Sequence, residues 1–144
     1  MSEENVEIAR RGFASLNEAY RVGDPSIFRP FLERYWDSDG VLEPSGLLPD
    51  SSPRPHTGQD GVLAFIGNQM EAFSEGSGWL EATEFIDHGD YLIVPYRLGG
   101  RARHTGLPVE FSFVALYRFQ NRKVTRMEVH RTKAEALEAA GLSE

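Results

Sequence analysis

Hydrophobic positions at the start of the chain recur with a helical period. One apolar stripe, with spacings of three and four residues, is formed by Val6, Ala9, Phe13, Leu16 and Tyr20. The spacing predicts a long first helix that ends at Gly23. Asp24 and Pro25 then predict the start of a second helix, because Asp is a good N-cap and Pro suits the first helical position. Pro30 makes this helix short or bent.

Four prolines fall between residues 44 and 56 and exclude a helix or a central strand there. We expect this segment to be an ordered flap or a mobile loop. His56, at its end, is expected in solvent, with closure over a neighbouring cavity as the alternative. A third helix begins near Gly58 and buries an apolar face formed by Val62, Phe65, Ile66 and Phe73.

From Trp79 onward the hydrophobic period shortens to two residues, which is typical of strands. Strands are predicted at about 79–88, 91–104, 108–119 and 124–131, after a turn at 37–40 and a short strand at 41–44. Thr132 and Glu135 form a capping box for a last helix that ends at Gly141.

The middle hairpin supports a more specific prediction. Placing His104 opposite Val109 sorts the two long strands into an uncharged face and a charged face. The same register pairs Arg103 with Glu110. The uncharged face then consists of the even-numbered residues 94–102 and the odd-numbered residues 111–117, with Tyr96 opposite Tyr117. We expect the helices to cover this face and to leave a cavity there.

The opposite face of the same strands mixes apolar and charged side chains. Ile93, Val114 and Leu116 lie among charges, and this mixture predicts a homodimer contact through the outer sheet face. A solvated outer face is the alternative. By the alternation of side chains along the last strand, we expect His130 to point to the outer face.

The charge and composition of the chain argue against several classes of function. The net charge of -7 argues against a nucleic-acid partner, since phosphate binding needs a positive face. No apolar run approaches the length of a membrane span. The acidic start is unlike a secretory signal, and the 144 residues include no cysteine, which together predict a cytoplasmic location.

Short sequences spread along the chain resemble the nuclear transport factor 2-like superfamily, in particular its SnoaL-like branch. They are ENVEIARR at 4–11, VGD at 22–24, VLEP at 41–44, EFID at 84–87 and AEALEAAGL at 134–142. The resemblance implies a single domain over residues 1–144 with an α+β, cystatin-like cone. In this fold a curved antiparallel sheet wraps around three N-terminal helices, a short C-terminal helix follows, and homodimers are usual.

Members of this superfamily include ketosteroid isomerases, polyketide cyclases, dehydratases, epoxide hydrolases and non-catalytic binding domains, so the fold alone does not choose an activity. Glu43 before Pro44 resembles the general base of the isomerases, and it is our candidate catalytic residue. The positions that match the isomerase oxyanion donors carry Leu16 and Ala115, which cannot donate. Arg97 lies on the charged face, which disfavours the epoxide hydrolase relay.

We expect a small hydrophobic, cyclic molecule as the ligand, with no cofactor and no metal, because no two histidines have metal-ligand spacing. Two hypotheses stay open: cofactor-free acid–base chemistry of the isomerase, cyclase or dehydratase type, or a non-catalytic dimeric ligand-binding or structural domain. The candidate ligand-binding residues are Tyr20, Trp36, Phe65, Gln69, Tyr96, Leu98, Phe113, Ala115, Tyr117 and Met127.

Overall fold

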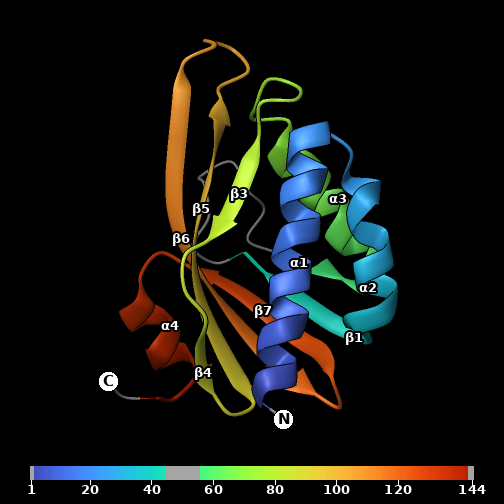
Figure 1. The fold of residues 1–144 in the computed structure, drawn as a ribbon, viewed down its shortest axis with the longest axis vertical. Coiled ribbons are helices and arrows are strands. Elements are labelled where there is room, and N and C mark those ends of the chain that lie inside the picture. The colour runs from blue at the N-terminus through green and yellow to red at the C-terminus, as the bar shows by residue number, and fades with distance from the viewer. Residues whose placement is uncertain (1, 45–55, 143–144) are drawn as a thin grey trace.

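The computed structural model describes residues 2–44 and 56–142, so most of the proline-rich segment lies outside the described residues. Helices α1 (Ser2–Val22), α2 (Arg29–Tyr35) and α3 (Gly58–Met70) lie on one face of a curved sheet, and α4 (Lys133–Ala139) lies on the other (Figure 1). Within the described ranges, no helix combines the length and the apolar character needed to cross a membrane.

The first helix follows the predicted apolar stripe. Phe13, Leu16 and Tyr20 are buried in the main core, and Val6 is partly buried against it. The helix ends where Gly23 adopts a positive φ of 82° and its N–H donates to the carbonyl of Ala19. This element is therefore confirmed at both its face and its end.

The predicted second helix is divided into two parts. The 3₁₀ helix η1 (Pro25–Phe28) begins at Asp24, whose carboxylate accepts from the backbone N–H of Ser26 at 2.9 Å. Helix α2 begins at Arg29, with Pro30 in its first turn. Proline has no N–H to continue an earlier helix, so the helical path is interrupted there.

The strands form one mixed sheet. They are β1 (Trp36–Glu43), β2 (His56–Thr57), β3 (Trp79–Ala82), β4 (Ile86–His88), β5 (Tyr91–Arg101), β6 (Pro108–Gln120) and β7 (Lys123–His130). Their order is β2-β1-β7-β6-β5-β3, and β4 also pairs with β5. The sheet is curved and mainly antiparallel, as predicted, and the pair of β1 with β7 is parallel.

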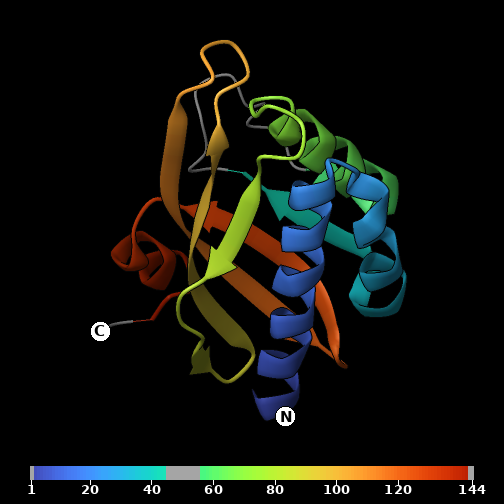
Figure 2. The ribbon, with the colours of Figure 1, turned by 45° about the horizontal axis from the view of Figure 1, so that its top comes forward.

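Two local predictions are also corrected. The predicted turn at 37–40 lies inside β1, where the pairing with β7 shifts register between Trp36 and Val41. The single strand predicted at 79–88 is two strands, β3 and β4, separated by residues 83–85. Figure 2 shows the sheet curving behind α1, so that its concave side receives the helices.

The hairpin of β5 and β6 has the predicted faces but a different register. Gly100, rather than His104, stands opposite Val109, and Tyr96 stands opposite Phe113 rather than Tyr117. The observed pairing of the two strands is shifted by four residues from the predicted pairing. Because side chains alternate between the faces of a strand, a shift by an even number of residues leaves every side chain on its predicted face. The even-numbered β5 residues and odd-numbered β6 residues therefore still point toward the helices.

The contacts of the residues that follow Arg101 explain the observed pairing. There the hairpin closes, because the N–H of Ala102 donates to the carbonyl of Leu107 at 2.8 Å and the N–H of Gly106 donates to the carbonyl of Ala102 at 2.7 Å. The same stretch also contacts the segment after α3: Phe73 pairs with Ala102, and the N–H of Arg103 donates to the carbonyl of Ala72 at 3.0 Å. The predicted pair of Arg103 with Glu110 is consequently absent. Arg103 donates instead to the carbonyl of Glu71 at 2.7 Å.

Helix α4 covers the apolar patch of the outer sheet face. Ile93, Val114 and Leu116 form a second buried cluster with Ala136 and Leu137. The helix begins as predicted, since the N–H of Glu135 donates to the Thr132 hydroxyl at 3.1 Å. The patch from which we predicted a homodimer contact is thus occupied by the chain's own last helix.

Candidate functional site

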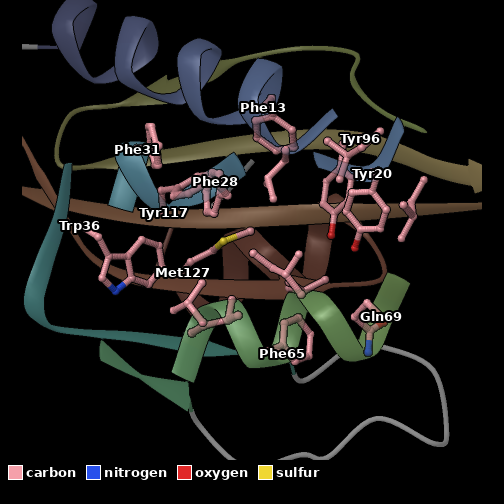
Figure 3. Close-up of a pocket in the computed structure, with 17 residues that line it drawn as sticks. Phe13, Tyr20, Phe28, Phe31, Trp36, Phe65, Gln69, Tyr96, Tyr117 and Met127 are labelled. Carbon is pink, nitrogen blue, oxygen red and sulfur yellow. The ribbon is translucent and has the colours of Figure 1, made fainter. Parts of the chain in front are cut away.

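A cavity lies between the concave side of the sheet and the helices α1, η1, α2 and α3 (Figure 3). The space open to the centre of a water-sized sphere is about 50 Å³, which is room for a few water molecules. Its wall is formed by Phe13, Leu16, Tyr20, Phe28, Phe31, Trp36, Leu42, Val62, Phe65, Ile66, Gln69, Leu80, Tyr96, Leu98, Tyr117, Met127 and Val129. The wall is therefore mainly aromatic and aliphatic.

Most of the predicted ligand-binding residues lie in this wall. They are Tyr20, Trp36, Phe65, Gln69, Tyr96, Leu98, Tyr117 and Met127. Phe113 and Ala115 do not line the cavity, although both are buried. The Phe113 ring packs between Phe111 and Tyr96, and Ala115 is fully covered opposite Val94. Their face was predicted correctly, but neighbouring side chains separate them from the open space.

Sequence reasoning missed several wall residues on the helices. Phe13 belongs to the apolar stripe predicted for the first helix, and Phe28 and Phe31 lie on the predicted second helix, where their helical spacing was the available signal. A hydrophobic period identifies the buried side of a helix. It does not identify which part of the core stays unfilled, because that depends on how several elements pack together.

Three tyrosine hydroxyls give the cavity its main polar character. Burial raises the pKa of Tyr20 and of Tyr117, and burial together with the nearby Tyr20 and Tyr117 raises the pKa of Tyr96. All three hydroxyls are therefore neutral hydrogen-bond donors at neutral pH. Figure 3 shows the rings of Tyr20 and Tyr96 next to each other, with both hydroxyls turned toward α3.

Among the hydrogen bonds formed within the described residues, none involves the hydroxyl of Tyr20, Tyr96 or Tyr117. The Phe13 ring packs against two of these rings, with centroids 5.4 Å from Tyr96 and 6.2 Å from Tyr117, and the Tyr20 ring packs against Phe73 at 6.3 Å. The cavity thus presents positioned donors that a bound molecule can use.

Trp36 contributes its ring face to the cavity but not its N–H. Its Nε1 is buried without a hydrogen-bond partner in the described structure. The nitrogen lies against Gly40, where an added Cβ would come within 2.5 Å of it. Glycine at position 40 therefore lets the indole pack against β1.

Glu43, our candidate catalytic residue, lies outside the described cavity wall. Leu42 points into the cavity, and alternation along β1 sends the next side chain, Glu43, to the outer face. There its carboxylate accepts from Nη2 of Arg126 at 2.6 Å. No carboxylate, imidazole or guanidinium belongs to the described cavity wall.

Glu43 belongs to a chain of ionic contacts on the outer face. Nε of Arg126 donates to Glu128 at 2.7 Å, and Nε2 of His130 lies 2.8 Å from the other oxygen of Glu128. Burial opposes ionisation of Glu128, but the hydrogen bonds from Arg126 and His130 outweigh it and lower its pKa. His130 thus faces outward, as predicted. Within the described ranges, no cluster of three or more acidic or histidine side chains could hold a metal ion.

Comparison with known proteins identifies this architecture. A family model of the SnoaL-like domain matches residues 14–127. No protein of curated function matches the sequence. The fold is similar to Bal32a, from a soil-derived mobile gene cassette, with a TM-score of 0.72, 19% identity and 96% of each chain covered.

Two further solved structures have the same fold. A protein described as a SnoaL-like polyketide cyclase from Jannaschia sp. CCS1 has a TM-score of 0.71 and 18% identity, over 96% of this chain and 92% of that one. TerC, co-crystallised with polyporic acid, has a TM-score of 0.67 and 19% identity, over 94% of this chain and 96% of that one. At these identities the similarity shows the fold alone.

Proposed function

The chain belongs to the SnoaL-like domain family, and we propose that its cavity binds a small, largely apolar, cyclic molecule with a hydrogen-bond-accepting oxygen, such as a ketone. The observation that carries this proposal is the set of neutral, unpartnered hydroxyls of Tyr20, Tyr96 and Tyr117 in an otherwise apolar wall. Pockets for small molecules typically combine an apolar wall with a few placed polar groups.

The wall favours flat, ring-containing ligands. Aromatic side chains bury large areas and pack edge-on or offset against other rings. Phe13, Phe28, Phe31 and Phe65 provide such surfaces. The co-crystal of TerC with polyporic acid supports the same ligand class, because it comes from a protein of this fold.

The donors suit an oxygen acceptor. A ketone oxygen can accept from a tyrosine hydroxyl, and a site built to pair with an oxygen binds a hydrocarbon analogue less well. In isomerase, cyclase or dehydratase chemistry, such donors would also stabilise negative charge that develops on the oxygen. That chemistry additionally needs a base.

The described cavity wall does not include a base, and Glu43 is paired with Arg126 on the other side of the sheet. Of the two hypotheses, this observation favours a domain that binds a ligand without converting it. A homodimer and a cytoplasmic location also stay proposals. Because α4 covers Ile93, Val114 and Leu116, a dimer would use other parts of the surface, and light scattering in solution tests it.

Matched ligands and variants test the binding proposal. Benzophenone and diphenylmethane differ by a ketone oxygen, and their dissociation constants can be measured by calorimetry. We expect Tyr96→Phe to weaken benzophenone binding about 5-fold, since one net hydrogen bond contributes about 1 kcal/mol, and to leave diphenylmethane binding unchanged. Tyr91→Phe is the control, because Tyr91 packs near α4 and beside Arg118, away from the cavity. Equal loss of both ligands, or no benzophenone binding to the wild type, would contradict the proposal.

A further inference from the structure

His56 lies immediately beside the cavity wall. It opens β2 and stands opposite Leu42 in the antiparallel pair of β1 and β2. Opposed residues in an antiparallel pair point to the same face. Since Leu42 lines the cavity, the His56 side chain is directed to the side of the sheet that the helices cover.

The imidazole packs against Phe65 of α3. The two ring centroids are 4.9 Å apart, and the rings are tilted by 48°. Phe65 lines the cavity, whereas His56 does not. The His56 ring is therefore in contact with a wall residue but is not itself part of the wall.

One nitrogen of His56 is buried and unpaired. In the part of the chain that the structure describes, Nε2 has no hydrogen-bond partner. Buried polar atoms are usually paired, so such an atom requires an explanation. Burial also lowers the pKa of His56, which keeps the ring neutral at neutral pH, with one donor and one acceptor nitrogen.

Neighbouring charged groups do not supply the missing partner. Glu43, which follows Leu42 on β1, is on the other face with Arg126. Asp60, in the first turn of α3, is paired with Arg29 at 3.0 Å. The acidic groups of the adjoining β1 and α3 segments are thus engaged elsewhere.

The size of the cavity provides the second observation. With about 50 Å³ open to the centre of a water-sized sphere, a ring-containing ligand must displace part of the wall. Displacement of the Phe65 ring opens the space in front of His56. We propose that His56 is a ligand-binding residue, reached when Phe65 rotates, and that its Nε2 forms a hydrogen bond with a second polar group of the ligand.

This inference rests on the proposed function and deepens it. His56 belongs to β2, whereas the tyrosine donors belong to α1, β5 and β6. The ligand class is then an apolar molecule with two separated polar groups. One is an oxygen that accepts from tyrosine, and the other is a hydroxyl that pairs with the neutral imidazole.

The test compares benzophenone with 4-hydroxybenzophenone by calorimetry. We expect the wild type to bind the hydroxylated ketone about 5-fold more tightly, the factor that corresponds to one net hydrogen bond. His56→Phe should bind the two ketones equally, and His56→Gln should retain part of the preference. His104→Phe, at the exposed hairpin tip, is the control and should keep the preference in full.

Every result separates the two proposals. If benzophenone does not bind the wild type, both fail. If it binds but the hydroxyl gives no gain, or the gain persists in His56→Phe, the assignment of His56 alone is overturned. Should His56→Phe not fold, the ¹⁵N chemical shift of Nε2 in the wild type decides: it must change with 4-hydroxybenzophenone and not with benzophenone, and any other pattern overturns the assignment.

Discussion

Removing the hydroxyl of Tyr96 should stabilise the protein in the absence of ligand. The Tyr96 residue is buried in the cavity wall, and the hydrogen bonds within the described residues do not include its hydroxyl. An unpaired buried polar group costs about 1–3 kcal/mol, and a water molecule in the cavity can recover part of this. We therefore expect Tyr96→Phe to raise the free energy of unfolding by about 1 kcal/mol.

Urea unfolding followed by circular dichroism measures this change, provided that the slope with urea is the same for both proteins. Tyr35→Phe is the control, because its exposed hydroxyl accepts from Nη1 of Arg11 at 3.3 Å; it should give no gain. With benzophenone present, the wild type should have the higher free energy of unfolding, since a ligand adds more stability to the protein that it binds more tightly. A loss of about 1 kcal/mol in ligand-free Tyr96→Phe would show that the hydroxyl has an internal partner and would refute the reasoning.

Three other predictions concern different parts of the molecule. Glu43→Gln should leave benzophenone affinity unchanged in calorimetry, because Glu43 lies on the outer face. Gly61→Ala should raise the free energy of unfolding by about 1 kcal/mol through helix propensity, whereas Gly12→Ala should lower it, since its Cβ would lie 2.8 Å from the Phe31 ring. The lowered pKa of Glu128 stabilises the fold above its ordinary value of 4.5. That contribution disappears as pH falls through the lowered pKa, so Glu128→Gln should flatten the acid side of the stability curve.

Each of these predictions can fail separately. A large loss of benzophenone affinity in Glu43→Gln would show that this carboxylate takes part in ligand binding. If Gly61→Ala and Gly12→Ala change the free energy of unfolding equally, the Phe31 ring moves to accommodate the added methyl group without a cost in stability. Identical acid dependence of wild type and Glu128→Gln would show that the outer ionic contacts contribute no pH-dependent stability.

The sequence was sufficient to predict which faces are buried. The stripe of Phe13, Leu16 and Tyr20 and the alternation along β5 and β6 each have a period that local geometry imposes. The hairpin register was not predictable in the same way. The hairpin closes where Ala102 bonds to Gly106 and Leu107, and Ala102 also pairs with Phe73, which is far away in the chain. A shift of the pairing by four residues leaves the hydrophobic pattern unchanged.

The outward position of Glu43 has a related cause. Its position before Pro44 resembles that of the isomerase base, but the parallel pairing of β1 with β7 decides that Leu42 faces inward and Glu43 outward. Likewise, Ile93 and its neighbours have the pattern of an interface, and the interface is with α4 of the same chain. A local pattern shows that a side chain is covered, whereas tertiary packing determines what covers it.

The methyl group of Met127 reports most directly on whether the cavity binds a ligand. The chain has three methionines, so ¹³C-methyl labelling gives few signals. Met127 lies in the cavity wall, near the middle of the view in Figure 3, and Met70 lines a separate cleft. On titration with benzophenone, the Met127 signal should shift with saturation and show intermolecular contacts to the ligand, while the Met70 signal changes little. A Met127 signal that stays unchanged at saturating benzophenone would contradict a ligand site between the helices and the sheet.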